Sequence, residues 1–361
     1  MVEIKKVPAN LQDDELTLYL KSMGLERISQ GKVRDTWSLK NLLKHNEYLL
    51  VIATDRISIF DYVLKPFIPK KGEVLTATTH FWLNNLDGIV HHLIDSEYEE
   101  GLNYAYDLRQ EYLGKLPIER CLVVKNLTGK MYPAELIFRQ HIGGSVFKDY
   151  QKTGIVAGQE LPLGLPKWAK LDEPLFTPST KAEVGNDVNV TADDFFNGME
   201  ILGLKEEAEN FVLMISQAYQ MAYCFAEEKG ILIMDTKFEG GGGVIADEIL
   251  TPDSSRFVLK SDWYKALKEG RDPKFLDKQP VRDWGATVPT PFFDANGDQI
   301  IGINNLKSDS SEYEKYIEFV QTVEVPENVI SDTTKRYTSL IRRLTGMSLK
   351  DYQVQKMGVG K

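Results

Sequence analysis

The sequence predicts an α+β fold of two lobes, an antiparallel β-rich N-terminal lobe and a mixed α/β C-terminal lobe, with a cleft between them. The chain has 361 residues, which is long for a single hydrophobic core. Short apolar runs separated by glycine and lysine turns favour strands in its first part, and a long amphipathic segment at 206–229 favours a helix in its second. We expect an N-terminal appendage at 1–28, the β-rich lobe at 29–132 and the α/β lobe at 133–361.

The first part is predicted to consist mainly of strands, because its apolar runs have the length of buried strands. We expect, in order, a helix at 13–23, a strand at 48–53, a helix at 75–84 and strands at 121–125 and 134–138. Residues 87–118 are polar and rich in tyrosine, and we interpret them as an insertion.

The second part is predicted to be organised around one long helix. In 206–229, Phe211 and Ile215 belong to an apolar set at helical spacing, and Gly230 is placed to end the helix. We expect this helix to pack against the core and to carry no chemistry. We also expect a loop at 289–309 and a last helix at about 331–344.

Composition excludes several classes of function. The formal charge is −10, from 43 Lys and Arg against 53 Asp and Glu, so the basic face of a nucleic-acid-binding protein is not expected. No apolar run approaches the length of a membrane span, and the N-terminus has no signal-peptide core. Only Cys121 and Cys224 are present, which predicts no disulfide framework and a cytoplasmic location. The partners should therefore be small molecules.

The segment 231–239 carries the strongest chemical signal. An apolar run leads into Asp235-Thr236-Lys237-Phe238-Glu239. Side chains alternate between the faces of a strand, so Asp235, Lys237 and Glu239 share one face. Two acids beside a cation suit a site that holds Mg²⁺ and phosphate together. Taken alone, the segment also fits an exposed strand whose charges pair with one another.

Four glycines and a second apolar run follow, which predicts a β-hairpin. If Gly240–Gly243 form the whole loop, Glu239 faces Val244 and Glu248 joins the charged face. A glycine bulge would bring Asp247 there instead. Both registers retain a carboxylate cluster.

The nucleotide-binding patterns restrict the choice of fold further. The chain contains neither a Walker A motif nor a strand–GxGxxG–helix fingerprint, so a P-loop or Rossmann fold is disfavoured. The remaining arrangement places ATP under an antiparallel lobe with a glycine turn, opposite a lobe whose acids hold Mg²⁺. Residues 31–34, Gly-Lys-Val-Arg, supply a candidate turn.

Taken together, the motifs resemble the phosphoribosylaminoimidazole-succinocarboxamide synthase (SAICAR synthetase) family. The matching segments, in chain order, are 31–35, 53–58, 69–76, 133–145, 176–190, 235–239, 247–257, 277–284 and 325–346. The resemblance implies a ligase of purine biosynthesis. In that reaction ATP activates the carboxylate of carboxyaminoimidazole ribotide (CAIR), and the amine of L-aspartate attacks it to give SAICAR, ADP and phosphate.

The resemblance also implies roles for particular residues. The implied catalytic residues are Arg139, Asp235 and Lys237, and the implied Mg²⁺ ligands are Glu239 and Asp247. The implied ATP-binding residues are Gly31, Lys32, Val33, Arg34, Lys71 and Glu135. The implied substrate-binding residues are Ser145, Lys181, Asp187, Asp253, Ser254 and Arg256.

Some positions depart from the family pattern. Gly240 replaces a phenylalanine, Gln140-His141 replaces Gly-Tyr, and the segment around Asn186 and Val188 is one residue shorter and lacks a histidine. We expected these positions to surround the substrate pocket. A paralogous ligase for another amine or ribotide, and a kinase-like phosphotransferase, are therefore alternative functions.

Overall fold

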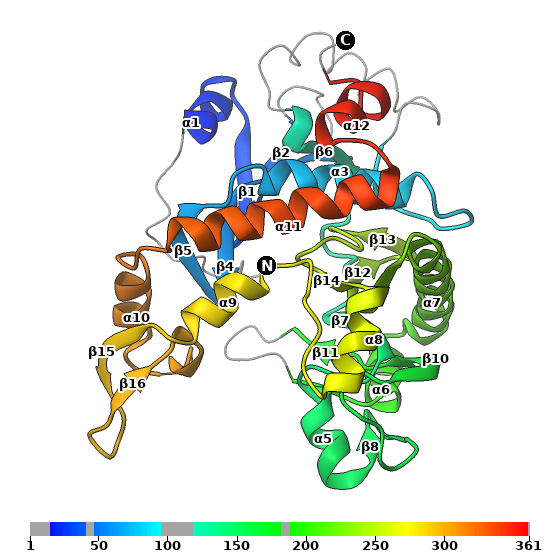
Figure 1. The fold of residues 1–361 in the computed structure, drawn as a ribbon. Coiled ribbons are helices and arrows are strands. Elements are labelled where there is room, and N and C mark those ends of the chain that lie inside the picture. Colours follow the sequence, from blue (N-terminus) through cyan, green and yellow to red (C-terminus); the bar gives the residue numbers. More distant parts are fainter. Residues whose placement is uncertain (1–14, 41–46, 95–117, 182–187, 309, 360–361) are drawn as a thin grey trace.

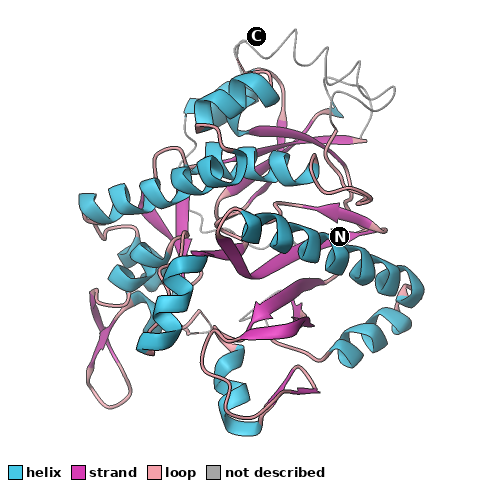
Figure 2. Cartoon of the chain, turned by 45° about the vertical axis from the view of Figure 1, so that its right-hand side comes forward, coloured by secondary structure: helices cyan, strands magenta, loops and turns pink. Residues whose placement is uncertain are grey.

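The computed structural model describes residues 15–40, 47–94, 118–181, 188–308 and 310–359. Its helices are α1 (Glu15–Ser22), α3 (Lys71–Leu83), α5 (Val146–Thr153), α6 (Ala192–Ile201), α7 (Lys205–Glu228), α8 (Lys260–Glu269), α9 (Gln279–Gly285), α10 (Tyr313–Val320), α11 (Glu327–Thr345) and α12 (Leu349–Lys356). Among the described helices, none is long and apolar enough to cross a membrane. The predicted α+β architecture is confirmed (Figures 1 and 2).

The N-terminal sheet is antiparallel, with the strand order β1-β2-β3-β6. Its strands are β1 (Glu26–Gln30), β2 (Arg34–Ser38), β3 (Tyr48–Ala53) and β6 (Cys121–Lys125). The predicted strands at 48–53 and 121–125 coincide with β3 and β6. A separate hairpin, β4 (Arg56–Ile59) and β5 (Tyr62–Phe67), follows β3.

The second, six-stranded sheet has a central path β10-β7-β12-β13, with β11 added to β7 and β14 added to β12. Its strands are β7 (Ala134–His141), β10 (Lys170–Phe176), β11 (Ser179–Thr180), β12 (Ile231–Gly241), β13 (Val244–Ala246) and β14 (Ser255–Leu259). The antiparallel register places Arg139 of β7 and Arg256 of β14 on either side of Asp235 in β12. This pairing determines the centre of the site described below.

Helix α7 packs along β12, as predicted for its apolar stripe. Phe211, Ile215 and Ala218 are buried, and Gly230 has φ 73° beyond the C-terminus of the helix. The positive φ explains why a glycine is needed there.

The predicted hairpin after β12 is present, and the structure defines the register that the sequence left open. Glu239 pairs with Ala246 and Gly241 pairs with Val244, so β12 continues through two of the four glycines. The turn consists of Gly242 and Gly243 alone, with φ 60° and 71°. Two-residue hairpins favour positive φ at both turn positions, which glycine adopts without strain. The four glycines therefore do not form the whole loop, and the alternative that would pair Glu239 with Val244 does not occur.

The C-terminal third contains more structure than we expected. Residues 289–309, expected to be a loop, include the hairpin β15 (Pro289–Phe293) and β16 (Gln299–Ile301) and a 3₁₀ turn at Ile303–Asn305. The last predicted helix is present as α11 but begins earlier, and α12 was not predicted. A short hairpin, β8 (Ile155–Val156) and β9 (Gln159–Glu160), follows α5.

The hydrophobic cores combine segments from both predicted lobes. One core unites Ile57 and Leu64 of β4–β5 with Val281 of α9 and Val320 of α10. The main core joins α3 to the second sheet and to α11. Figure 1 shows α11 crossing the molecule beside α3, and α11 contacts both α3 and α9. Residues before and after position 132 therefore share hydrophobic cores.

Candidate functional site

A cavity of about 250 Å³ lies between the second sheet and the segment that begins α9. Strand alternation supplies one wall, because Glu135, Ile137 and Arg139 point from the same face of β7. The remaining lining residues are Asp235, Thr236, Lys237, Pro252, Asp253, Ser254, Ser255, Arg256, Asp277, Lys278 and Arg282. The lining is dominated by charged and hydroxyl side chains, which suits a polar, multiply charged ligand.

Asp235 is the centre of one charged group in this cavity. Arg139 Nη1 lies 2.5 Å from Asp235 Oδ2, and Arg256 forms an ion pair with the same oxygen. Arg139 is buried, and this burial lowers the pKa of its guanidinium, although Asp235 opposes the shift. Two guanidinium groups share a single carboxylate, so a positive charge remains for an anionic ligand.

Lys237 is the centre of a second charged group. Its Nζ lies 2.9 Å from Glu135 Oε1 and 3.0 Å from Glu239 Oε1, while Lys181 pairs with the other oxygen of Glu239. Burial would lower the pKa of Lys237, but Glu239 and Glu135 outweigh it and raise that pKa. Burial would likewise raise the pKa of Glu239, but Lys237 and Lys181 lower it to about 2. Lys237 and Glu239 are therefore both charged at neutral pH.

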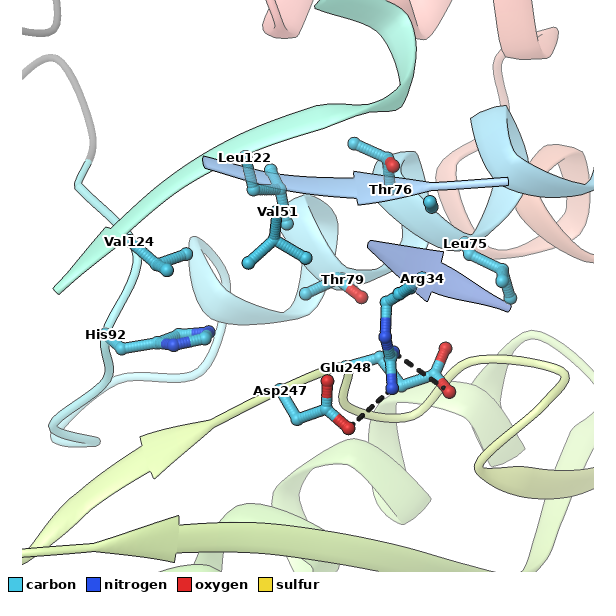
Figure 3. A pocket seen from close by; sticks show the side chains of 11 residues that line it. Arg34, Val51, Leu75, Thr76, Thr79, His92, Leu122, Val124, Asp247 and Glu248 are labelled. Atoms are coloured by element: carbon cyan, nitrogen blue, oxygen red, sulfur yellow. Dashed lines mark hydrogen bonds and ion pairs between the residues drawn. The ribbon is translucent and has the colours of Figure 1, made fainter. Parts of the chain in front are cut away.

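Asp247 and Glu248 both pair with Arg34. The sequence left open which of the two carboxylates joins the charged cluster, and in the structure both lie beside it. Arg34 Nη2 lies 2.5 Å from Asp247 and Nη1 lies 3.0 Å from Glu248, as Figure 3 shows. Burial raises the pKa of Asp247 to about 6, with Arg34 opposing and Glu239 and Glu248 adding to the shift. Negative charge is thus concentrated here.

A small apolar pocket of about 20 Å³ adjoins Arg34. Val51, Leu122 and Val124 of the first sheet cover it, and His92 lies at its side (Figure 3). Its volume is close to that of one water molecule, so a larger ligand requires these side chains to move.

Lys71 lies in an environment different from the one we expected. It is 0% exposed and its Nζ lies 2.6 Å from Asp253 Oδ2. The hydroxyl of Tyr337 donates to Asp253 Oδ1 at 2.5 Å. Burial would raise the pKa of Asp253, but Lys278 and Lys71 lower it. In this structure Lys71 supports the wall of the cavity and does not reach solvent.

The backbone of the candidate phosphate-binding turn at 31–34 is fixed by hydrogen bonds from the side chains of Thr54 and Arg56. Arg56, which is buried, donates to the carbonyl oxygens of Gly31 at 3.1 Å and Lys32 at 3.3 Å, and it pairs with Asp35. Thr54 Oγ1 donates to Val33 O at 2.8 Å. Lys32 itself is partly exposed and pairs with Asp61. Asp55, next to Arg56 in the sequence, accepts a hydrogen bond from Gly72 N at 2.8 Å.

The other expected substrate residues differ in their placement. Ser145 is exposed before α5, and among the described residues its side chain makes no capping hydrogen bond. Ser254 is buried and accepts a hydrogen bond from Thr251 N at 3.0 Å, so it shapes its own loop. Asp187 and Asn186 lie outside the described residues, and Val188 is exposed.

The cavity includes residues that the sequence did not single out. Asp277, Lys278 and Arg282 lie before and within α9 and complete its wall. Burial, Arg282 and Lys71 lower the pKa of Lys278 to about 8, while Asp253 opposes the shift. Their only sequence signal was the matching segment 277–284, which by itself assigns no role.

Three of the departures from the family pattern, Gly240, Gln140 and His141, do not line the cavity. Gln140 and His141 are the last two residues of β7, and both are buried. Gln140 donates to Leu171 O, and the His141 ring lies between Trp168 O and Tyr223 OH. At Gly240, a Cβ atom would lie 2.3 Å from Phe211 Cζ, so the Phe211 ring fills the space of the missing side chain. None of these three positions lines the cavity of about 250 Å³.

The structure is thus an α+β fold with two large sheets, and its candidate site has a lining suited to a small anionic ligand. The family model of SAICAR synthetase matches residues 27–295. The phosphoribosylaminoimidazole-succinocarboxamide synthase of Thermodesulfovibrio yellowstonii is 35% identical over 333 residues, covering 89% of this chain and 96% of the relative. That of Schizosaccharomyces pombe is 36% identical over 329 residues, covering 89% and 94%.

A solved structure gives the same result. The SAICAR synthase of Saccharomyces cerevisiae in complex with SAICAR superposes with a TM-score of 0.66 at 31% identity, over 90% of this chain and 96% of that one. The chain therefore belongs to the SAICAR synthetase family, as the resemblance of its motifs indicated, and it is an enzyme.

Proposed function

We propose that this enzyme forms an amide between the carboxylate of CAIR and the amine of L-aspartate, consuming ATP and releasing SAICAR, ADP and phosphate in purine biosynthesis. The carrying observation is the cavity of about 250 Å³, in which Arg139, Arg256 and Lys237 face one another. Relatives with this enzyme's name match nearly the whole chain.

The chemistry requires two transfers. A CAIR carboxylate oxygen attacks the γ-phosphorus of ATP and ADP leaves, giving an acyl phosphate. The neutral amine of aspartate then attacks the acyl carbon, phosphate leaves and the amine loses a proton. Positioning and charge stabilisation contribute most to such steps.

The ribotide is assigned to the arginine side of the cavity. Arg139 and Arg256 offer guanidinium donors to its phosphate and carboxylate, with Ser145, Asp253, Ser254 and Asp187 as further proposed contacts. Lys237, the centre of the second charged group, lines the same cavity, where it can neutralise the acyl phosphate. Asp235 holds both arginines in place. Lys181 is proposed to contact the substrate when it exchanges its partner Glu239.

ATP is assigned to the side of the cavity nearest the first sheet. The N–H groups of the turn at 31–34 and the side chains of Lys32 and Arg34 are suited to its phosphates. Glu135 lies beside Lys237 and is proposed to position the lysine near the nucleotide. Lys71 is proposed to act indirectly, because its Nζ is buried against Asp253.

Mg²⁺ is assigned to Glu239 and Asp247. No cluster of three His, Cys, Asp or Glu side chains suited to a metal occurs among the described residues. Magnesium bound with a nucleotide commonly takes one or two carboxylates and completes its shell with phosphate and water, so this donor set fits the ion. Burial is the main cause of the raised pKa of Asp247, and Glu239 and Glu248 add to it, so a bound cation would offset their negative charge. The ion would supply charge neutralisation at the phosphates.

The deciding experiment measures ADP release with CAIR alone, with L-aspartate alone and with both, together with SAICAR formation. We expect stoichiometric ADP and SAICAR only when both substrates are present. ADP release with neither substrate, or phosphorylation of CAIR that ignores aspartate, would favour the kinase-like alternative. An inactive Lys237→Met variant serves as the control for contaminating ATPase.

A further inference from the structure

The carboxylate of Asp253 is held by two side chains from distant parts of the chain. Lys71 is the first residue of α3, and Tyr337 belongs to α11. Lys71 is 0% exposed and Tyr337 is 1% exposed, and they approach different oxygens of Asp253 at 2.6 and 2.5 Å. A buried ammonium and a buried phenol are costly without partners, so each contact fixes its side chain and Asp253 together.

Helix α11 supports a second wall of the cavity through the neighbouring residue. Arg336 Nη1 donates to Phe275 O at 2.6 Å, and Phe275 leads into the segment of Asp277 and Lys278. The two α11 residues that make these contacts, Arg336 and Tyr337, lie outside residues 27–295, which match the family model. Figure 1 shows α11 spanning the molecule above α9 and beside α3, consistent with its contacts to both helices.

Asp253 connects these supports to the cavity. It precedes Ser254, Ser255 and Arg256, which line the cavity, and Lys278 Nζ lies 3.8 Å from its Oδ1. A displacement of Asp253 would therefore move the base of the loop that carries Arg256. Small displacements in substrate-positioning groups reduce affinity strongly.

We propose that Lys71 and Tyr337 are positioning residues that act through Asp253 and set the affinity of the cavity for the ribotide. The proposal rests on the proposed function, because it assigns the cavity to CAIR. Part of the affinity for the ribotide would then depend on helix α11, which carries Tyr337.

The first test replaces Tyr337 by phenylalanine, which removes only the hydroxyl. The KM for CAIR is expected to rise about three- to tenfold, the equivalent of one hydrogen bond, with kcat within about twofold of wild type. The Kd of ADP should be unchanged. Tyr62→Phe is the matched control, because Tyr62 is equally buried and donates to Leu306 O at 3.3 Å, away from the cavity.

The second test asks whether Tyr337 acts through Asp253. In an Asp253→Asn background, Tyr337→Phe should change the KM for CAIR by less than about twofold, because coupled residues are not additive. Lys71→Met should raise the KM for CAIR more than Tyr337→Phe does, since it removes the closer of the two cations that pair with the buried Asp253 carboxylate. If the Asn or Met variants do not fold, the comparison of Tyr337→Phe with Tyr62→Phe decides alone.

The outcomes separate the two proposals. If wild type makes SAICAR and Tyr337→Phe matches Tyr62→Phe in every kinetic constant, the positioning role is overturned and the ligase function stands. Additive effects of Tyr337→Phe and Asp253→Asn would also overturn it. If wild type makes no SAICAR, the ligase function is overturned, and the positioning proposal with it.

Discussion

Two adjacent glycines give Arg256 its place at the cavity. A Cβ atom at Gly144 would lie 2.7 Å from Arg256 Nη1, and one at Gly143 would lie 2.2 Å from the Trp168 ring. Arg256 itself lies over that ring, 5.6 Å from its centroid. The sequence shows the Gly-Gly pair as part of a family motif, but the arginine it accommodates lies more than a hundred residues away and becomes evident only in the fold.

Arg256→Ala is expected to weaken CAIR binding far more than nucleotide binding. Loss of one charge-assisted contact costs about 1.5–3 kcal/mol, or about ten- to a hundredfold in affinity. Calorimetry with CAIR and with ADP measures both effects. Arg271→Ala, which removes an arginine paired with Asp262 and Glu269, is the control and should change neither. Equal losses for both ligands with Arg256→Ala would remove this residue from the ribotide site.

Glu239→Gln is expected to lower turnover by at least about tenfold and to raise the Mg²⁺ concentration needed for half-maximal rate. Glu239 pairs with Lys237 and Lys181, and its pKa of about 2 keeps it ionised. The amide removes one negative charge from the proposed metal site but keeps the shape of the side chain. A Mg²⁺ titration of the initial rate tests this, with the exposed Glu269→Gln as control. A wild-type titration curve would contradict the assignment.

At the scale of a strand, alternation decides which departures from the family matter. Glu135, Ile137 and Arg139 face the cavity from β7, while Phe138 is buried against Tyr219 of α7. The Gln140 side chain is also buried and donates to Leu171 O. The sequence shows the alternation with a period of two, but it does not show which face of the strand lines the cavity. The hairpin register could not be predicted either, because four consecutive glycines permit more than one turn. The structure also places Asp247 at φ 61°, which no sequence pattern indicated.

His141, at the end of β7, is expected to make the protein less stable in acid. Burial lowers its pKa to about 4, below the ordinary value of about 6.5. A depressed histidine pKa favours the neutral form in the folded state. Its contribution is therefore complete above pH 6.5 and is lost as the pH falls toward 4, by about 3 kcal/mol in total.

The measurement is the free energy of unfolding between pH 4 and 7.5. His141→Gln removes the titrating group, so its curve should be flatter than that of wild type across this range. Tyr62→Phe should shift the curve without changing its slope, because it removes no titrating group in this range. If His141→Gln runs parallel to wild type, His141 is not the origin of the acid sensitivity.

At the scale of the whole molecule, local sequence patterns identify single helices and strands, whereas contacts between distant segments are seen only in the folded structure. The apolar run at Tyr48–Ala53 and the amphipathic segment of α7 identified their elements closely, because each signal is contained in one segment. Lys71, Asp253 and Tyr337 come together from positions that no local pattern links. The sequence assigned Lys71 to ATP by resemblance, whereas its burial depends on α11 packing over α3. Contacts of this kind require the assembled fold.

The assembled fold also bears on substrate choice. The charged groups of the cavity wall come from β7, β12, β14 and the start of α9, while Gly240, Gln140 and His141 lie in the core. Rejection of a wrong substrate depends on buried polar groups that it leaves unpaired, and these groups line the cavity. We therefore expect L-aspartate to be the preferred amine. Kinetics with CAIR, ATP and a panel including L-glutamate and L-asparagine test this, with aspartate expected to exceed each by at least about tenfold in kcat/KM. If another amine exceeds aspartate by about tenfold, a gap of about 1.4 kcal/mol, the enzyme is a paralogous ligase for that amine.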